Sequence, residues 1–478
     1  MADPVLTVAE LLRPTFTHIA GGVDSDPVVR RSDRADAQVN GSLALAKQLG
    51  KTPREVAQLV LDAADLSRVC SAIEIAGPGF INVTFSNEFL ASELVAAAAD
   101  TRLGVRNAPA KLKVVVDYSA PNVAKEMHVG HLRSTVIGDA LVRMLEFVGH
   151  SVVRENHIGD WGTPFGMLIE HLIDLGETEA ANELSVGDLD SFYRQARTKF
   201  DSNDEFKERA RARVVLLQSG DVDTLRMWRL LVAESARYFA KVYKILGVLL
   251  TEQDIMGESA YDPLLAKVVN RLRSSGLIEV SDGAEVVFPE GFLNRENEPL
   301  PLIIRKTDGG YNYATSDLAC VIDRVERIGA NLVLYVVGSP QAQHLEMVAT
   351  VSRMAGWIPE GTELTHVAFG SVLGADRKIM KSRSGKSVKL DALLSEAIER
   401  AAFAVKEKNA ELPAAQQAEV ARQIGIGAVK YADLSTDRIK DYVFDWERML
   451  AFEGNTSPYL QYAHARICSI FRRTGVDR

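Results

Sequence analysis

Residues 112–162 carry the pattern that most limits what this chain can fold into. The short run "LKVVVDYS" is typical of a buried strand, and apolar residues then recur at helical spacing over 132–148. Gly149 is placed to end that helix, and "SVVREN" is typical of a following strand. Strand, loop, helix and strand within about forty residues predict a βαβ unit with parallel strands.

Two histidines lie where the first strand of this unit leads into the helix. His128 and His131 flank Gly130 in the string "HVGH". The carboxyl ends of parallel strands and the N-termini of helices are where α/β sheets bind anionic ligands, and two imidazoles add hydrogen-bond donors there. The same spacing is compatible with a surface histidine pair, or with one imidazole that caps the helix.

The length of 478 residues predicts two to four domains. The chain divides into three regions, namely 1–108, 109–378 and 379–478. The first combines a helical stretch at 35–64 with two strand-like runs around the turn at 77–79, and the second holds insertions near 164–232 and 260–310. We therefore predict an α/β protein with a Rossmann-like parallel-sheet domain, a small N-terminal α/β domain and a C-terminal α-helical segment.

The sheet is expected to resume in the second half of the middle region. Residues 331–356 have the pattern of a strand followed by a helix, and "HVAFGSVLG" at 366–374 is typical of another strand. Beyond about residue 390 the pattern is helical. These segments would complete a parallel sheet around the βαβ unit.

Composition narrows the class of protein and its compartment. The formal net charge is −9, so any contact with nucleic acid would have to use local basic patches. No apolar stretch approaches a membrane span, and the N-terminus lacks the basic start of a signal peptide. The three cysteines, Cys70, Cys320 and Cys468, form neither a metal-binding spacing nor a disulfide framework, which fits a reducing cytosol.

Basic residues are concentrated once, at 376–390. Six of them stand against the single acid Asp376, namely Arg377, Lys378, Lys381, Arg383, Lys386 and Lys389. Serines and a glycine are interleaved, which is typical of a loop that can close over phosphates. A solvated surface loop is the alternative.

Several long strings resemble one family, the arginyl-tRNA synthetases among the class I aminoacyl-tRNA synthetases. "HVGH" resembles the class I His-x-Gly-His signature, and "SAPNVAKEMHVGHLRST", "NHIGDWGTPFG", "DGGYNYATSDLAC", "GAVKYADLS" and "DWERMLAFEGNTSPYLQYAHAR" are similar to strings of the arginine enzyme in the same order. The resemblance runs from about residue 32 to the last residue. A lone His-x-Gly-His would be weak, whereas five long strings in order are specific.

The resemblance implies that the chain activates L-arginine with ATP and Mg²⁺ and transfers it to tRNA(Arg). The implied catalytic residues are His128, His131, Lys125, Lys381 and Arg383. The implied ATP-binding residues are Gly130, Gly370, Val372 and Met380 together with the two histidines. Ser382 stands where most class I enzymes have a second lysine, and Lys125 is expected to supply that cation instead. No protein-bound structural metal is expected.

A guanidinium is best held by carboxylates beside an aromatic face. The resemblance assigns seven residues to arginine, namely Asp117, Ser119, Asn122, His157, Tyr313, Asp317 and Gln341. Taken alone, Asp317 is more typical of a helix N-cap.

The resemblance also concerns tRNA and the ends of the chain. Phe80 and Asn82 match the contact motif of an N-terminal domain that touches the tRNA elbow, with Phe80 as a core residue the alternative. Residues 379–478 would hold the signature loop, a stem-contact region and the start of an anticodon-binding domain, most of which is expected to be absent. We expect a cytoplasmic monomer. The competing hypothesis is a truncated paralogue that forms arginyl-adenylate for a non-tRNA acceptor.

Overall fold

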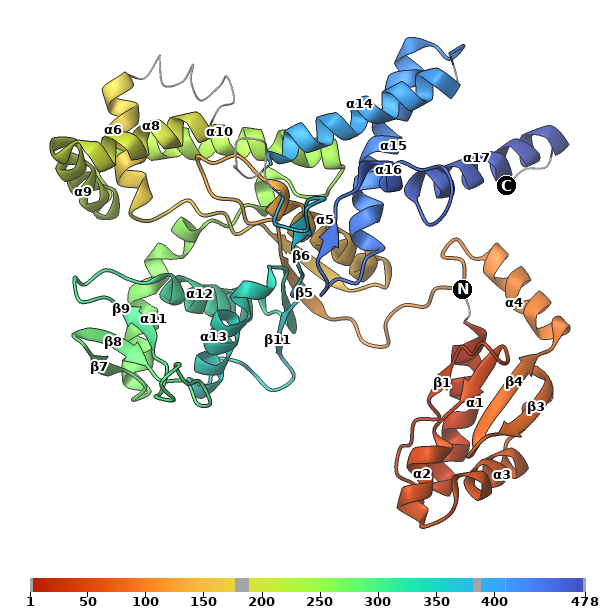
Figure 1. Ribbon diagram of the computed structural model, residues 1–478. Coiled ribbons are helices and arrows are strands. Elements are labelled where there is room, and N and C mark those ends of the chain that lie inside the picture. Colours follow the sequence, from red (N-terminus) through yellow and green to blue (C-terminus); the bar gives the residue numbers. More distant parts are fainter. Residues whose placement is uncertain (1–2, 177–188, 381–387, 409, 476–478) are drawn as a thin grey trace. The chain divides into compact units, whose positions relative to one another are not determined.

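The computed structural model describes residues 3–176, 189–380, 388–408 and 410–475, drawn in Figure 1. The chain forms two compact units, Met1–Pro109 and Ala110–Arg478. Lys381 and Arg383, both predicted to be catalytic, lie outside the described residues.

The first unit is a small α/β fold. Its antiparallel sheet has the order β1-β2-β4-β3, formed by Val29–Arg30, Ala37–Val39, Phe80–Phe85 and Cys70–Ala76. Its helices are α1 (Pro4–Ile19), α2 (Ser42–Leu49), α3 (Pro53–Ala63) and α4 (Asn87–Ala99). The stretch at 35–64 was expected to be helical throughout, but Ala37–Val39 pairs with β4 because Ala37 and Val39 are buried against the core on one face. Tertiary packing overrides helical propensity there.

The second unit is built on a parallel sheet of order β11-β10-β5-β6. Its strands are β5 (Lys113–Asp117), β6 (Ser151–Glu155), β10 (Leu332–Tyr335) and β11 (Glu363–His366). Helix α5 (Val129–Phe147) connects β5 to β6, and α13 (Ala342–Met354) connects β10 to β11. The predicted α/β fold with a parallel sheet is confirmed. The strand order reverses between β5 and β10, and crevices at such points bind ligands.

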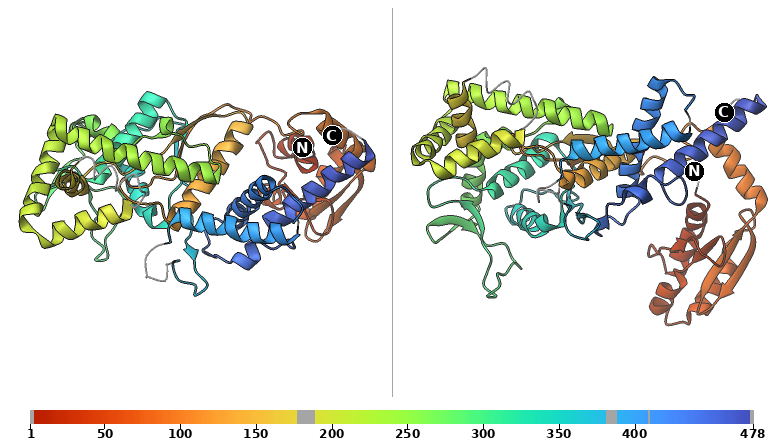
Figure 2. Two further views of the ribbon diagram at one scale, coloured as in Figure 1. Left: turned by 90° about the horizontal axis from the view of Figure 1, so that it is seen from above. Right: turned by 45° about the horizontal axis from the view of Figure 1, so that its top comes forward.

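Two insertions enlarge this unit. The first is helical, with α6 (Pro164–Leu175), α8 (Leu189–Ser202), α9 (Asp204–Ser219) and α10 (Val222–Leu246). The second pairs α11 (Asp262–Ser274) with an antiparallel sheet of β7 (Glu279–Ser281), β8 (Ala284–Val287) and β9 (Leu302–Arg305), followed by α12 (Tyr313–Ile322) and the π-helix η3 (Asp323–Ile328). Short 3-10 turns are η1 (Glu252–Asp254), η2 (Glu258–Tyr261) and η4 (Ser339–Gln341). Figures 1 and 2 show helices α8 to α10 on one side of the unit, apart from β7 to β9.

The last part of the second unit is mainly helical, with α14 (Leu390–Lys408), α15 (Ala414–Leu434), α16 (Trp446–Met449) and α17 (Ser457–Thr474). The strand expected at 366–374 is largely absent from the described structure. Strand β11 ends at His366, and only Val372–Leu373 (β12) is extended again, where it pairs with Tyr442–Val443 (β13). Two short segments that lie 70 residues apart in the sequence are thereby joined.

Candidate active site

A strained loop leads from β5 into α5. Ser119, Ala120 and Ala124 have φ values of 74°, 47° and 57°, a left-handed region that side chains rarely adopt. The backbone N–H of Ser119 donates to Ser134 Oγ at 2.8 Å. The N–H of Ala124 donates to Ser235 Oγ at 2.9 Å. Such conformations persist where the surroundings enforce them, and they cluster at functional sites.

His128 and His131 cap α5, and their rings lie against each other at an angle of 45°. Nδ1 of His128 accepts from the Gly130 N–H at 3.0 Å, and Nδ1 of His131 accepts from the His128 N–H at 3.1 Å. The ring centroids are 4.1 Å apart. Because each Nδ1 accepts, a neutral ring carries its proton on Nε2 and can donate it to an anion. Capping the helix and binding a ligand are therefore compatible.

Both imidazoles are neutral near pH 7. Burial, and to a smaller extent the neighbouring His128, lower the pKa of His131 to about 3. Burial also lowers the pKa of His128, although Asp190 opposes that shift. The two rings thus offer neutral donors, so positive charge toward a phosphate must come from other residues.

A cavity of about 220 Å³ opens beside this helix start. Its lining includes the residues predicted to contact ATP, His131 excepted, namely His128, Gly130, Gly370, Val372 and Met380. A Cβ added to Gly130 would lie 2.7 Å from His128 Cε1, so glycine here makes room for the histidine ring. The structure brings these residues together from two separate segments, 128–130 and 370–380.

One buried guanidinium holds the wall of this cavity together. Arg133 Nη1 donates to the carbonyls of Gly370 at 2.8 Å and Lys440 at 2.9 Å. Its Nε lies 3.4 Å from a carboxylate oxygen of Asp433, and both side chains are almost completely buried. Sequence reasoning missed both residues. The signal available in the sequence was the charged residue Arg133 on the buried face of α5, one turn before Val136.

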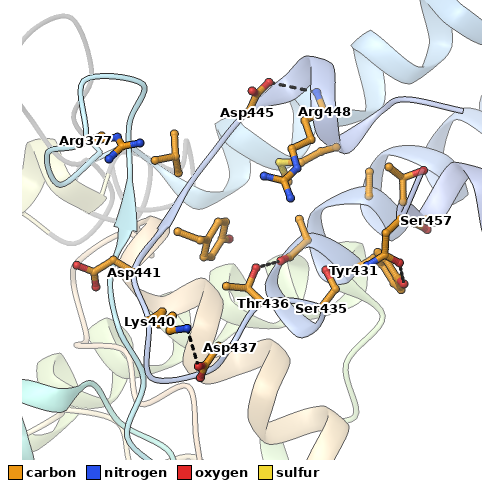
Figure 3. Close-up of a pocket in the computed structure, with 17 residues that line it drawn as sticks. Arg377, Tyr431, Ser435, Thr436, Asp437, Lys440, Asp441, Asp445, Arg448 and Ser457 are labelled. Atoms are coloured by element: carbon orange, nitrogen blue, oxygen red, sulfur yellow. Dashed lines mark hydrogen bonds and ion pairs between the residues drawn. The ribbon is translucent and has the colours of Figure 1, made fainter. Parts of the chain in front are cut away.

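A second cavity, of about 560 Å³, lies among α15, α16 and residues 435–445 (Figure 3). The Arg448 guanidinium points into it, and the hydroxyls of Ser435 and Thr436 lie on its wall. Lys440, whose carbonyl binds Arg133, belongs to the same wall. Arg133, which lines the first cavity, therefore links it to the wall of the second.

Buried charges lie at the carboxyl ends of β5 and β6. Arg324 donates from Nη2 to Asp117 Oδ2 at 2.7 Å and from Nε to Glu155 Oε2 at 2.6 Å. Burial opposes the charge of Arg324, but the two carboxylates raise its pKa well above the ordinary value. Asp117 Oδ1 is buried and has no hydrogen-bond partner among the described residues. The three groups carry one net negative charge.

Asp317 lies within α12 and does not cap it. The N-cap of α12 is Asn312, whose side chain accepts from the Tyr313 N–H, so the N-cap interpretation of Asp317 is wrong. Asp317 Oδ2 accepts from His344 Nε2 at 2.6 Å. The Tyr313 and His344 rings are 4.7 Å apart between centroids. Asp317 and Tyr313 thus share the contact with His344.

Asp317 and Asp117 lie near the same buried thiol, since both carboxylates act on Cys320 electrostatically. A ring nitrogen of His157 also lies within 4.8 Å of the ligand atoms of Asp317 and Cys320. His157 Nδ1 binds the Met256 carbonyl at 2.9 Å. Three of the predicted arginine contacts, Asp117, His157 and Asp317, are therefore close to one another.

The remaining predicted arginine contacts are placed differently. Ser119 Oγ bonds to the Tyr243 hydroxyl at 2.8 Å inside the protein, so its side chain is already engaged. Asn122 is exposed and lies against Gly159, where an added Cβ would be 2.2 Å from Asn122 Oδ1. Gln341 is exposed at the start of α13. None of these three forms a hydrogen bond with Asp117 or Asp317 in the described structure, and each stays a prediction.

Lys125 reaches toward the helical insertion. Its Nζ lies 4.5 Å from the ring centroid of Tyr193 on α8, in a cation–π arrangement.

In the first unit, Phe80 and Asn82 share one face of β4, whereas Ile81 between them is buried. Asn82 Oδ1 accepts from Gln38 Nε2 at 2.8 Å. Phe80 is only partly buried, which is contrary to the alternative that it is a core residue.

A parallel sheet with a ligand crevice at its switch point and a histidine-capped helix defines a nucleotide-binding α/β enzyme. Residues 93–446 match the family described as "tRNA synthetases class I (R), catalytic domain", and residues 7–85 match "Arginyl tRNA synthetase N terminal domain". The chain belongs to the arginyl-tRNA synthetases, a family of class I aminoacyl-tRNA synthetases.

Individual relatives agree. The chain is 53% identical to the arginine–tRNA ligase of Thermobifida fusca over 100% of its own length and 83% of the relative's, and 50% identical to that of Shigella sonnei over 98% and 82%. It resembles the crystal structure of arginyl-tRNA synthetase from Plasmodium falciparum, with a TM-score of 0.85 and 28% identity over 99% of this chain and 81% of that one. The Thermus thermophilus enzyme shares the fold, with a TM-score of 0.81 at 24% identity.

These matches leave two expectations without support. Relatives align along the whole of this chain, which covers 82–83% of their length, and the expectation that it lacks most of an anticodon-binding domain is not borne out. They favour a tRNA ligase over the paralogue with a non-tRNA acceptor. Among the described helices, none is both long and apolar enough to cross a membrane.

Proposed function

We propose that the arginine–tRNA ligase reaction of this chain takes place between the mouth of α5 and the pocket that contains Asp117 and Asp317. L-Arginine attacks the α-phosphorus of ATP and releases pyrophosphate, and the arginyl group then passes to the 3′-terminal adenosine of tRNA(Arg). ATP enters as its Mg²⁺ complex. Such a displacement is catalysed by positioning and by stabilising the charge on the phosphates.

The observation that carries the proposal is the charge count at the end of the sheet. Asp117 and Glu155 are buried with one guanidinium, Arg324, and Asp117 Oδ1 has no partner in the described part of the chain. A buried unpaired charge is costly, so the pocket is short of one cation. The substrate guanidinium would supply that cation together with planar donors for Asp117 and Asp317.

On the ATP side, the residues have distinct roles in this proposal. The Nε2–H groups of His128 and His131 donate to the phosphates, and their neutrality at pH 7 suits donation without a trapped charge. Gly370, Val372 and Met380 enclose the nucleotide in the adjoining cavity. Lys125, with Lys381 and Arg383 of the signature loop, supplies positive charge to the leaving pyrophosphate.

The domain roles are also proposals. The first unit touches the tRNA elbow through Phe80 and Asn82, which stand on one face of β4. The middle region holds the chemistry, and the region from 379 onward contacts the acceptor stem. Within it, the cavity with Arg448 combines a guanidinium with hydroxyls, which suits a phosphate or a ribose. A monomeric state and a cytoplasmic location complete the proposal.

The test compares arginine with citrulline, which has the same shape but a neutral side chain, and with lysine. Each is supplied with ATP, Mg²⁺ and tRNA(Arg), and charging is measured at steady state. Arginine should be preferred over both by at least about a thousandfold in kcat/KM, because the neutral analogue leaves the buried carboxylates unpaired. Charging of citrulline or lysine at a rate within about tenfold of arginine would contradict the pocket assignment.

A further inference from the structure

Three side chains beside the buried carboxylates are suited to a metal ion. A ring nitrogen of His157, a carboxylate oxygen of Asp317 and Cys320 Sγ lie within 4.8 Å of one another. Asp317 and Cys320 are three residues apart on α12, so they share a helix face, and His157 follows β6. We infer that this trio binds a thiophilic divalent cation such as Zn²⁺, and that the bound ion excludes arginine from the pocket.

The orientation of two of the three ligands is already fixed. His157 Nδ1 lies 2.9 Å from the Met256 carbonyl, which can only accept, so Nδ1 carries the proton and Nε2 keeps its lone pair. Asp317 Oδ2 is held by His344, which leaves the other oxygen for a ligand. In protein metal sites, histidine–carbonyl and histidine–carboxylate contacts of this kind orient the ligands.

The donor set selects the type of ion. One nitrogen, one sulfur and one oxygen are the donors that Zn²⁺ prefers, whereas Mg²⁺ requires oxygen in octahedral geometry. The bonds of a tetrahedral Zn²⁺ site place its donors about 3.3–3.8 Å apart, so a pair of donors at the 4.8 Å limit must approach by about 1–1.5 Å. Cys320 is buried, and Zn²⁺ would displace its proton on binding. Water completes the fourth position.

The neighbouring charges favour a cation as well. Asp117, Glu155 and Asp317 all act on the Cys320 thiol, and Arg324 offsets only part of that negative charge. Glu258 lies close enough to His157 and Asp317 to interact with both electrostatically, so a further carboxyl group is near the trio. The pocket that attracts a guanidinium therefore also attracts a metal ion. Asp317 cannot bind the arginine guanidinium and the metal ion at the same time.

This inference rests on the proposed function, since competition requires that arginine binds at Asp317. Zn²⁺ should raise the KM for arginine without changing kcat or the KM for ATP. At about ten times its dissociation constant it should raise that KM roughly tenfold. Mg²⁺ at the same concentration should have no such effect.

The direct test uses Co²⁺ as a spectroscopic probe for the Zn²⁺ site in the full chain, freed of metal. A thiolate-to-cobalt charge-transfer band should appear, should be absent in Cys320→Ala, and should persist in Cys70→Ala, whose half-buried thiol lies in the first unit. Cys320→Ala should still charge tRNA with arginine, which shows that it is folded, and should resist Zn²⁺. A band that survives Cys320→Ala, or no band in the unmodified chain, would overturn the metal site.

The last arm separates the two proposals. Addition of arginine should abolish the cobalt band in parallel with its binding. A Cys320-dependent band that saturating arginine leaves unchanged would overturn the competition and, with it, the placement of arginine at Asp317, because the band itself requires no catalysis. Loss of the band in the inactive variant His128→Ala would likewise contradict the inference, since that histidine lies outside the trio.

Discussion

Replacing Asp317 with asparagine removes one charge from the proposed arginine pocket and leaves its shape intact. The carboxylate accepts from His344 at 2.6 Å and its side chain is 26% exposed, so it is partly screened by water. Asparagine retains an oxygen for His344, so α12 should not be disturbed. The expected loss is therefore that of an ionic contact to the substrate rather than of a structural one.

The size of that loss follows from the degree of burial. A desolvated charge pair is worth about 2–5 kcal/mol, and the partial exposure of Asp317 favours the lower half of that range. A loss of about 2–3 kcal/mol corresponds to a rise in the arginine KM of roughly 30- to 160-fold. The KM for ATP should hardly change, because no residue of the proposed ATP cavity forms a hydrogen bond or ion pair with Asp317 in the described structure.

The assay is ATP–pyrophosphate exchange with tRNA(Arg) present, at varied arginine and ATP. A matched control is Asp323→Asn, one residue beyond α12, whose carboxylate pairs with Arg327 and not with His344. That variant should keep the arginine KM within about twofold. An Asp317→Asn enzyme with an unchanged arginine KM would refute the reasoning and place the guanidinium partner elsewhere.

Three further outcomes follow. Burial raises the pKa of Glu258 to about 7, so this carboxyl group gains its negative charge as the pH rises through that value. The KM for arginine should therefore fall between pH 6 and 8. Glu258→Gln should flatten this dependence in a pH series. Arg133→Met should lower the free energy of unfolding by about 3–5 kcal/mol in a denaturant titration, and the added change Asp433→Leu should recover part of it, because an unpaired buried carboxylate causes most of the loss. Lys125→Ala should slow ATP–pyrophosphate exchange. Tyr193→Leu should slow it in part and Tyr193→Phe should not, since only an aromatic ring holds the lysine. Equal rates in the two Tyr193 variants would contradict this role of the ring.

The sequence was sufficient wherever the determining pattern is local. The βαβ unit was predicted because apolar spacing along α5 and the flanking β-branched runs are read within some forty residues, and Gly149, with a φ of 95°, follows the helix as expected. The strings that resemble the family also placed His128, Gly370 and Met380 in one cavity, although neither spacing nor composition could have done so.

The sequence was insufficient wherever the contact is distant. Arg324 meets Glu155 across 169 residues and Asp117 across 207, and Arg133 meets Lys440 across 307. An arginine in a helical pattern is normally read as exposed, so its burial with a carboxylate is invisible without the fold. The strand expected at 366–374 was wrong for a related reason. Gly370 lies so close to the backbone of Lys440 and Asp441 that a Cβ would be 2.6 Å from it, and this contact replaces regular pairing.

The position of Arg133 has a consequence for how the protein is made. Its carboxylate partner lies 300 residues further along the chain, so at about 5–20 residues per second a ribosome needs roughly 15–60 s to deliver it. During that interval the start of α5 exists without the backbone that will hold its guanidinium, whereas Met1–Pro109 is already complete. The nascent wall of the proposed ATP cavity is therefore exposed to chaperones and proteases for longer than any part of the first unit. Synonymous changes that alter translation speed between residues 133 and 433 should affect the yield of active protein.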